Sequence, residues 1–339
     1  MSRKRCCVIF IILLVLLSAL VVINIATGTV SLKPSEIISI LSGGSDDSPY
    51  YTILYNIRLP RIAAAIVLGG ALALSGYLLQ TFFDNPIVGP FVLGVSSGAK
   101  LCVALIMIFF LSKGISLGSV AMIIAAFVGA LTVMCFVLLI SFKAKNMSIL
   151  VVCGIMIGYI CSAVTDLLVT FADDSNIVNL HNWSMGSLSG INWTQVLQMS
   201  VITFACLIVA FLLSKPMGAY RLGEAYARNM GVNITFLRIM LILSASMLAA
   251  CVVAFAGPIS FVGIAVPHLM RLSFKTSEPK VMVPASFIGG SVVTLLCDCL
   301  ARNIFAPTEV SISSVTAVLL VPVVISMLLK RRKNSVKNA

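Results

Sequence analysis

Long stretches without a charged residue are the feature that most limits how this chain can fold. The first runs from Cys6 to Ile23, directly after the basic start Arg3-Lys4-Arg5. The apolar core of a signal peptide has about 7–15 residues, and this run is longer and has no convincing cleavage site after it. We therefore predict a retained first membrane span rather than a cleaved leader.

Nine more apolar segments follow, and each approaches the length of about 20 residues that a spanning helix needs. The uncharged stretch that starts at Ile239 is too long for one helix, and Gly257-Pro258 breaks it because proline removes a backbone donor. It gives a seventh span and a shorter eighth that ends near Arg271. The other predicted spans are 62–83, 91–112, 117–142, 148–171, 196–214, 281–303 and 315–329.

The composition agrees with this count. The chain of 339 residues is 60% hydrophobic and 10% charged, whereas soluble domains have about 45–50% apolar and about 25% charged residues. We predict one polytopic all-α membrane domain over residues 1–339, with about ten transmembrane helices.

The distribution of basic residues predicts the orientation. With an even number of spans both termini lie on one side, and most of the 23 Lys and Arg residues fall on that side together with the termini. Cytoplasmic segments retain Lys and Arg, so we place both termini in the cytoplasm of a prokaryotic cell and the chain in its cytoplasmic (inner) membrane. Orientation does not explain the basic residues predicted on the outer side, which are Lys33, Arg58, Arg61, Lys113 and Arg302.

Several residues within the spans invite a functional interpretation. Asp298 and Arg302 are four apart on the ninth span, which favours a helical ion pair; a structural and a recognition role are equally compatible with that spacing. Asp166 and Lys100 lie near opposite ends of the fifth and third spans, where each lines a polar path or extends toward the interface. Small residues repeat every four positions at Gly154, Gly158 and Ser162, a pattern that favours helix packing over a pore wall.

The largest inner loop, about 215–238, is predicted to contain a short amphipathic helix. Glu224 and Arg228 form an i,i+4 pair, and Gly231 suits a helix stop. Such a helix is either a solvated connector or a docking element for a cytoplasmic partner.

Enzymatic chemistry finds no support in the sequence. There is no GxxxxGK[ST] loop to cradle nucleotide phosphates, so any ATP-driven work must come from another chain. The GxSxG match at Gly94–Gly98 lacks the sheet context and partner histidine that a serine hydrolase needs. The ten cysteines lie mostly inside apolar runs without metal-ligand spacing. We therefore expect a transport subunit without a metal site or cofactor.

Seven stretches in one order then resemble a single family, the FecCD-type permeases of ABC importers for iron-siderophore complexes, haem and cobalamin. The matching stretches are Arg58-Leu-Pro-Arg61, Gly69–Gly76, Gln80–Gly98, Trp183–Gly190, Gly223–Val232, Gly257–His268 and Asp298–Arg302. They span residues 58 to 302. This resemblance implies the type II importer architecture, which also has ten spans and cytoplasmic termini.

The resemblance also implies partners and site residues. It implies a homodimer, or a pair of like permeases, with two cytoplasmic ATPases on the loop that carries Arg221, Glu224, Arg228 and Gly231. An extracytoplasmic substrate-binding protein would dock, through its acidic residues, on Arg58, Arg61 and Arg302. The fifth and tenth spans would switch access to a smooth translocation path lined by Gly154, Gly158 and Ser162, with Asp166 near its outer mouth. The cargo would be a bulky metal chelate, with a ferric siderophore favoured and haem or cobalamin also compatible.

The chain departs from the family pattern near its last span. At four positions the family often has glycine or proline, and this chain has Ser260, Ser311, Ser313 and Leu320. We therefore do not infer the substrate from the tenth span or the outer gate. The competing class is an ATP-independent secondary transporter or channel for a small solute. A transporter of that class is expected to have acidic residues in the middle of its spans, or inverted repeats, and the sequence shows neither.

Overall fold

The computed structural model describes residues 3–28, 37, 40, 49–111, 119–143 and 147–337, with side chains up to 329. Throughout these residues the regular secondary structure is helical. Eight helices are long and apolar enough to cross a membrane. They are α1 (Arg3–Ala26), α4 (Leu59–Phe82), α6 (Ser119–Ser141), α7 (Met147–Thr170), α9 (Trp193–Leu212), α12 (Ile234–Ala256), α14 (Pro279–Asn303) and α15 (Ile312–Lys337).

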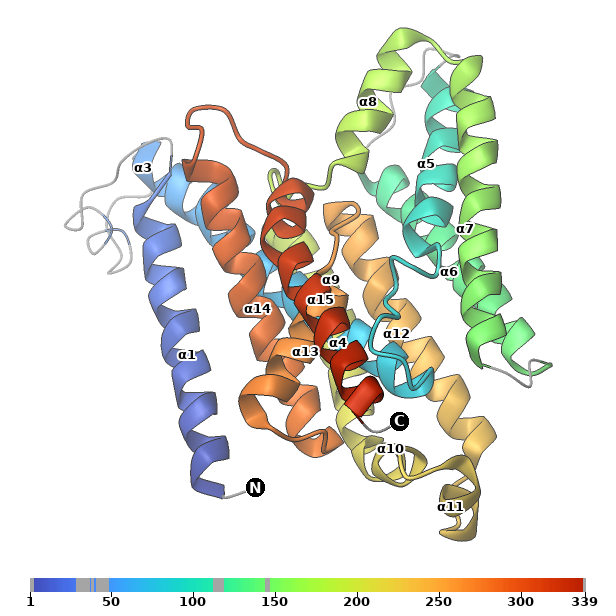
Figure 1. Cartoon of the computed structure of the whole chain (residues 1–339). Coiled ribbons are helices and arrows are strands. Elements are labelled where there is room, and N and C mark those ends of the chain that lie inside the picture. Colours follow the sequence, from blue (N-terminus) through green and yellow to red (C-terminus); the bar gives the residue numbers. More distant parts are fainter. Residues whose placement is uncertain are drawn as a thin grey trace.

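Two shorter apolar helices complete the ten predicted segments within the described part of the chain: α5 (Val95–Leu111) and α13 (Val262–Phe274). The remaining elements cap the two ends of the bundle. They are α3 (Pro49–Tyr51), the π-helix η1 (Thr52–Arg58), α8 (Asp174–Ser184), α10 (Ser214–Tyr220) and α11 (Glu224–Asn229). Figure 1 shows both chain ends toward the same end of the bundle as α10 and α11, whereas α3 and α8 lie at the opposite end.

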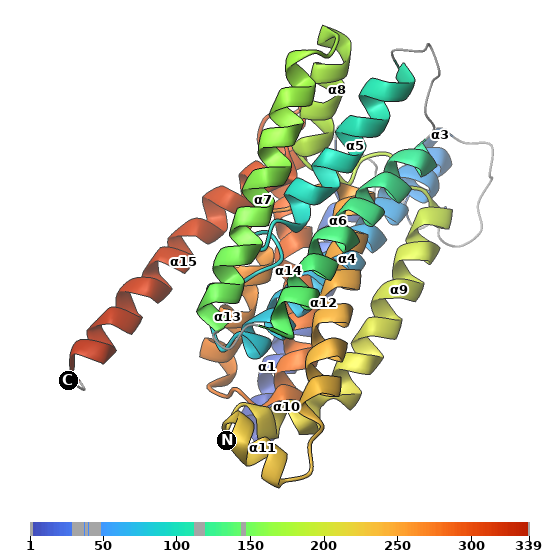
Figure 2. The ribbon, with the colours of Figure 1, turned by 90° about the vertical axis from the view of Figure 1, so that its right-hand side faces the viewer.

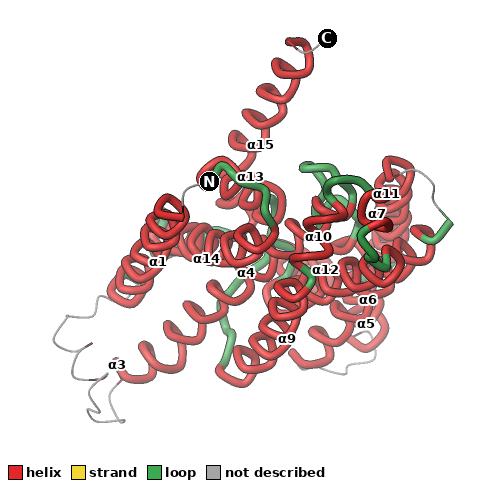
Figure 3. The backbone as a smooth tube through the Cα atoms, turned by 90° about the horizontal axis from the view of Figure 1, so that it is seen from below, coloured by secondary structure: helices red, strands yellow, loops and turns green. Residues whose placement is uncertain are grey.

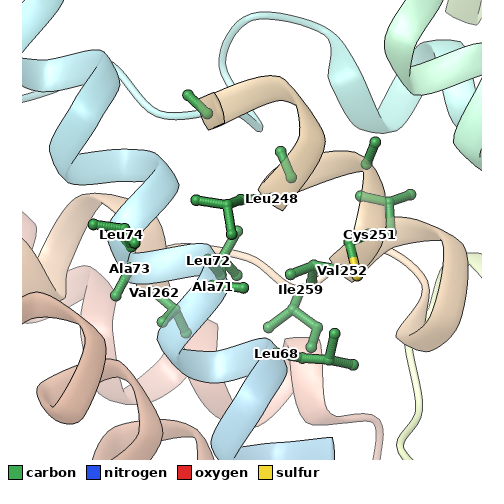
Figure 4. Close-up of a cluster of buried hydrophobic side chains, with 14 of the residues drawn as sticks. Leu68, Ala71, Leu72, Ala73, Leu74, Leu248, Cys251, Val252, Ile259 and Val262 are labelled. Carbon is green, nitrogen blue, oxygen red and sulfur yellow. The ribbon is translucent and has the colours of Figure 1, made fainter. Parts of the chain in front are cut away.

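Helix α4 forms the centre of the bundle, where it packs against α9, α12, α13 and α14. It is the most buried of the long apolar helices in the described chain. Leu68 and Leu72 of α4 meet Leu248 and Val252 of α12, and Ile259 from the following loop closes the cluster (Figure 4). The apolar contact area therefore surrounds the helix that begins at the RLPR motif.

Close approach of backbones at α4 depends on glycine. A Cβ built on Gly76 would lie 1.7 Å from the carbonyl oxygen of Gly263 in α13, and one on Gly69 would lie 2.7 Å from the carbonyl oxygen of Gly290 in α14. In lipid no hydrophobic force drives helices together, so they associate through van der Waals contacts. Small residues strengthen these contacts because they let the backbones approach closely. The matched stretch Gly69–Gly76 is thus a packing surface.

The break predicted at Gly257-Pro258 is confirmed. Helix α12 ends at Ala256, Gly257 adopts a positive φ of 73°, and α13 begins at Val262. The predicted start of the third span near Phe91 is wrong, because residues 83–94 form a non-helical connection and α5 begins only at Val95. Pro86 and Pro90 disfavour a helix there, and protein surrounds much of this irregular backbone.

Three helices lie largely outside the packed core. For α1, α7 and α15 less than a quarter of the apolar window is buried inside the subunit. The C-terminal part of α15 leaves the bundle and projects away from it, as both Figure 2 and Figure 3 show. These helices are left with wide apolar faces for lipid or for another protein.

Candidate functional site

A cluster of charged side chains lies at the end of the bundle opposite the chain termini. The RLPR motif starts there, where the seven-residue π-helix Thr52–Arg58 continues directly into α4. Pro60 in the first turn of α4 donates no backbone N–H, and the carbonyl oxygen of Tyr55 accepts from the indole N–H of Trp193 at 2.9 Å. π-helical turns are frequent at functional sites, and here they lead into the helix start that carries Arg58 and Arg61.

Asp298 on α14 holds two of the three predicted docking arginines. Its carboxylate accepts hydrogen bonds from Nε and Nη2 of Arg61 over 3.0–3.2 Å, and its Oδ2 lies 3.3 Å from Nε of Arg302. The Asp298 side chain is 1% exposed. The predicted contact between Asp298 and Arg302 is therefore present, but Arg61 from α4 shares the same carboxylate.

The end of α1 orients the other guanidinium groups. Arg58 donates to the carbonyl oxygen of Ile25, and Arg302 donates to the side-chain oxygen of Asn24, which is fully buried. The last turn of a helix presents unpaired carbonyl oxygens and a partial negative charge, which suits a cation. The first span thus serves as a support for the arginine cluster.

A second carboxylate reaches the cluster from the loop 304–311 between α14 and α15. Both oxygens of Glu309 accept from Nη1 of Arg61 at 3.0 Å, and its side chain is 38% exposed. A cavity of about 210 Å³ opens between all three arginines, Glu309, Gly28, Ile53 and Ile57. Among the described residues of this cluster, three guanidinium groups lie beside two carboxylates, and all three arginines line the cavity.

Three outer loops meet beside this cluster. The N–H of Ser187 donates to the carbonyl oxygen of Ala256 at 2.8 Å, which joins the loop after α8 to the end of α12. Ser313 at the start of α15 donates to the carbonyl oxygen of Pro258. Ser313 is one of the departures from the family pattern, and its hydroxyl therefore forms a contact that glycine lacks.

The opposite end of the molecule carries the predicted inner helix. Glu224 at the start of α11 contacts Arg228 at 2.7 Å, and it also contacts Arg238 on α12 at 2.8 Å. Arg221 donates to the carbonyl oxygen of Ser277 before α14, and Gly231 adopts a positive φ of 81° after α11.

Burial raises the pKa of Tyr220, whose hydroxyl donates to the carbonyl oxygen of Phe82 at 3.4 Å. Ion pairs and hydrogen bonds therefore connect this loop to α12, α14 and α4.

The glycines predicted to line the translocation path pack against a neighbouring segment of the same subunit. Gly154 and Gly158 are buried against Leu93 and Gly94, just before α5, and the hydroxyl of Ser162 donates to that of Ser97 at 3.2 Å. A role of these residues in the path stays a prediction. Helical packing was the interpretation that the four-residue spacing favoured.

Two isolated charges are placed apart from both sites. Asp166 is exposed on α7, on the side of the helix that also exposes Met156 and Tyr159. Lys100 lies half-buried on α5, and no carboxylate among the described side chains forms an ion pair with it.

Sequence reasoning missed the residues that support the arginines. Asn24 is a polar residue inside an apolar run, which is itself a signal, because polar groups within a span are costly unless they are paired. Glu309 gives no such signal, because a single carboxylate in an outer loop does not indicate its partner. Arg238 lies at the end of the inner loop, where a basic residue fits the orientation of the chain, and it completes the contacts of Glu224.

Comparison with known proteins agrees with this geometry. The model of the FecCD transport family matches residues 14–330. The hemin transport system permease protein HmuU of Yersinia pestis is 33% identical over 85% of this chain and 86% of its own length. The vitamin B12 import system permease protein BtuC of Citrobacter koseri is 35% identical over 83% of this chain and 84% of its own. A solved structure of a metal-chelate type ABC transporter in an inward-facing conformation matches with a TM-score of 0.83 and 30% identity, over 95% of this chain and 99% of the other.

The fold and these matches define a permease subunit of an ABC importer, a multi-pass protein of the bacterial inner membrane with type II architecture. The chain belongs to the FecCD transport family. Its ATPase is a separate subunit, as the missing P-loop requires. Membership decides between the two classes of transporter in favour of the ATP-driven importer.

Proposed function

We propose that this permease imports a bulky metal chelate by alternating access, as a homodimer served by two ATPases and an extracytoplasmic binding protein. A ferric siderophore, haem and cobalamin are the candidate cargoes. The hemin and vitamin B12 permeases among its relatives support this range. The observation that carries the proposal is the cavity lined by Arg58, Arg61 and Arg302 at the outer end of the bundle.

The cavity suits an acidic side chain of a binding protein. Three guanidinium groups line one cavity, so an incoming carboxylate would meet several arginine side chains at once. Guanidinium groups bind carboxylates through paired N–H donors, and such charge-assisted bonds are stronger than neutral ones. A homodimer would present the cluster twice.

The inner loop suits an ATPase. Around Glu224 and Arg228 the short helices and their connections expose Leu222, Tyr226 and Met230, three large apolar side chains at the cytoplasmic end. Exposed apolar groups beside charged ones are typical of a surface that another protein covers. Contacts of Arg221 and Glu224 with neighbouring elements would pass a movement of the ATPase into the bundle.

The path is proposed along the free faces of α7 and α15. Both helices expose apolar residues that are large for a surface in water, among them Tyr159 and Val318. A second copy would cover part of these faces and leave a channel between them, with Asp166 near its outer end. ATP binding and release would then shift the population between outward-open and inward-open states.

Charge reversal tests the docking step. We would replace Arg58, Arg61 and Arg302 by glutamate, one at a time, in the complete transporter reconstituted with its ATPases. ATP hydrolysis without binding protein shows whether each variant assembles. We expect the binding protein to lose most of its stimulation of hydrolysis in the variants, whereas Lys113→Glu, which reverses another predicted outer charge, should respond normally. Normal stimulation in all three arginine variants would refute the docking assignment.

Cargo is tested separately by uptake. Proteoliposomes that contain the assembled transporter, its binding protein and internal ATP should accumulate one of ferric siderophore, haem and cobalamin above the others. Accumulation without ATP, or of a small solute instead of all three chelates, would contradict the proposal.

A further inference from the structure

The two carboxylates that hold Arg61 differ in their surroundings. Asp298 is 1% exposed, lies on α14 and contacts two arginines. Glu309 is 38% exposed and lies on the irregular loop 304–311. Within the described part of the chain its carboxylate accepts side-chain hydrogen bonds only from Nη1 of Arg61. Asp298 is therefore a fixed part of the cluster, whereas Glu309 has the solvent access and the flexible attachment that displacement requires.

Glu309 also sits between two cavities. It lines the cavity of about 210 Å³ that the three arginines share, and it lines a second cavity of about 160 Å³ toward Met185, Leu188 and Ile312. Arg61 lines both of them as well. A carboxylate that enters the first cavity would therefore meet the ion pair between Arg61 and Glu309 at its wall.

We propose that Glu309 is an internal competitor for Arg61, which an acidic residue of the docking protein displaces. This inference rests on the proposed docking function. The Glu309 side of this ion pair is exposed, whereas Arg61 is 8% exposed. We therefore take the upper end of the range of about 0–1 kcal/mol for a surface ion pair, which an incoming carboxylate of good geometry can replace. In the free permease Glu309 keeps Arg61 paired and lowers its attraction for unrelated anions.

Displacement of Glu309 would affect the outer end of α15. Only two residues separate Glu309 from Ile312, where α15 begins. The N–H of Val310 donates to the carbonyl oxygen of Ala301 at 3.0 Å, and Ser313 donates to the carbonyl oxygen of Pro258. A shift of Glu309 therefore strains contacts at the outer end of α15, one of the two helices proposed to line the path.

The test compares Glu309→Gln and Glu309→Ala with Asp174→Asn. Asp174 is an exposed carboxylate on α8 at the same end of the bundle, and it forms no ion pair with any arginine whose side chain the structure describes. We would measure the affinity of the full transporter in nanodiscs for the purified, substrate-free binding protein encoded with this permease. Loss of a competitor worth about 1 kcal/mol should tighten the dissociation constant about fivefold in both Glu309 variants, and Asp174→Asn should leave it unchanged.

Each outcome separates the inference from the docking proposal. If Arg302→Glu weakens binding while both Glu309 variants bind like the wild type or more weakly, Glu309 is not a competitor and docking on the arginines stands. If Arg302→Glu and Arg58→Glu leave the affinity unchanged, docking itself is wrong and the competitor role falls with it. Equal tightening by Asp174→Asn would indicate a general charge effect and would also overturn the inference. Two Glu309 variants are used so that misfolding of one leaves the test intact.

Discussion

Asp298→Asn should be the most destabilising single-atom exchange in the outer cluster. The substitution keeps the shape of the side chain and removes the charge that holds Arg61 and Arg302. Removing one partner of a buried ion pair typically costs about 3–5 kcal/mol, because the other charge stays buried without compensation. Here Arg61 retains Glu309, Arg302 retains Asn24, and the new amide keeps one acceptor oxygen. We therefore expect the lower end of that range, about 3 kcal/mol.

The assay is equilibrium unfolding of the purified permease in mixed micelles, titrated with a denaturing detergent. Asp166→Asn is the matched control, since it is the same exchange at an exposed site on α7, where surface substitutions usually change the free energy of unfolding by about 0.5 kcal/mol or less. Adding Arg302→Met to Asp298→Asn should cost less than the two single substitutions together, because it removes a buried charge that has lost its partner. Equal stability of the two Asn variants, or full additivity in the double variant, would refute the account of a buried, shared carboxylate.

Two further predictions concern packing and coupling. Gly76→Ala should lower the thermal midpoint strongly, because its methyl group would lie 1.7 Å from the carbonyl oxygen of Gly263, whereas Gly218→Ala meets open space and should not; similar melting curves would contradict the tight helix contact. Glu224→Gln removes the ion pairs with Arg228 and Arg238, so we expect weaker ATPase binding in pull-down titrations, by about threefold for two solvent-open pairs. Unchanged binding would indicate that Glu224 has no part in that interface.

The membrane topology could be predicted from the sequence because its determinants are local. Long apolar runs and clusters of basic residues require no knowledge of distant contacts, and the break at Gly257-Pro258 follows from the backbone properties of those two residues. The contact between Glu224 and Arg228 was equally predictable, since i,i+4 neighbours share a helix face.

The supports of the outer cluster were not predictable in this way. Arg61 and Asp298 are 237 positions apart, and Arg302 and Asn24 are 278 apart. No periodic pattern reports such pairs, because they depend on how α1, α4 and α14 pack. The stripe of small residues on α7 has the same limit: it shows that one face is tightly packed, but it does not say whether the neighbour is α5 or a second subunit.

Burial of the arginines also explains how they can serve in docking. A flexible surface arginine loses side-chain entropy when a partner fixes it, at a cost of about 0.5–1.5 kcal/mol for each immobilised side chain. In this permease the three arginines are already held in place: Arg61 by Asp298, Arg302 by Asn24, and Arg58 by a carbonyl oxygen at the end of α1. Most of that cost is therefore met during folding, and the geometry of the cluster selects partners whose carboxylates match it. Weakening Asn24 or Asp298 should then reduce discrimination between binding proteins even where the arginines themselves remain.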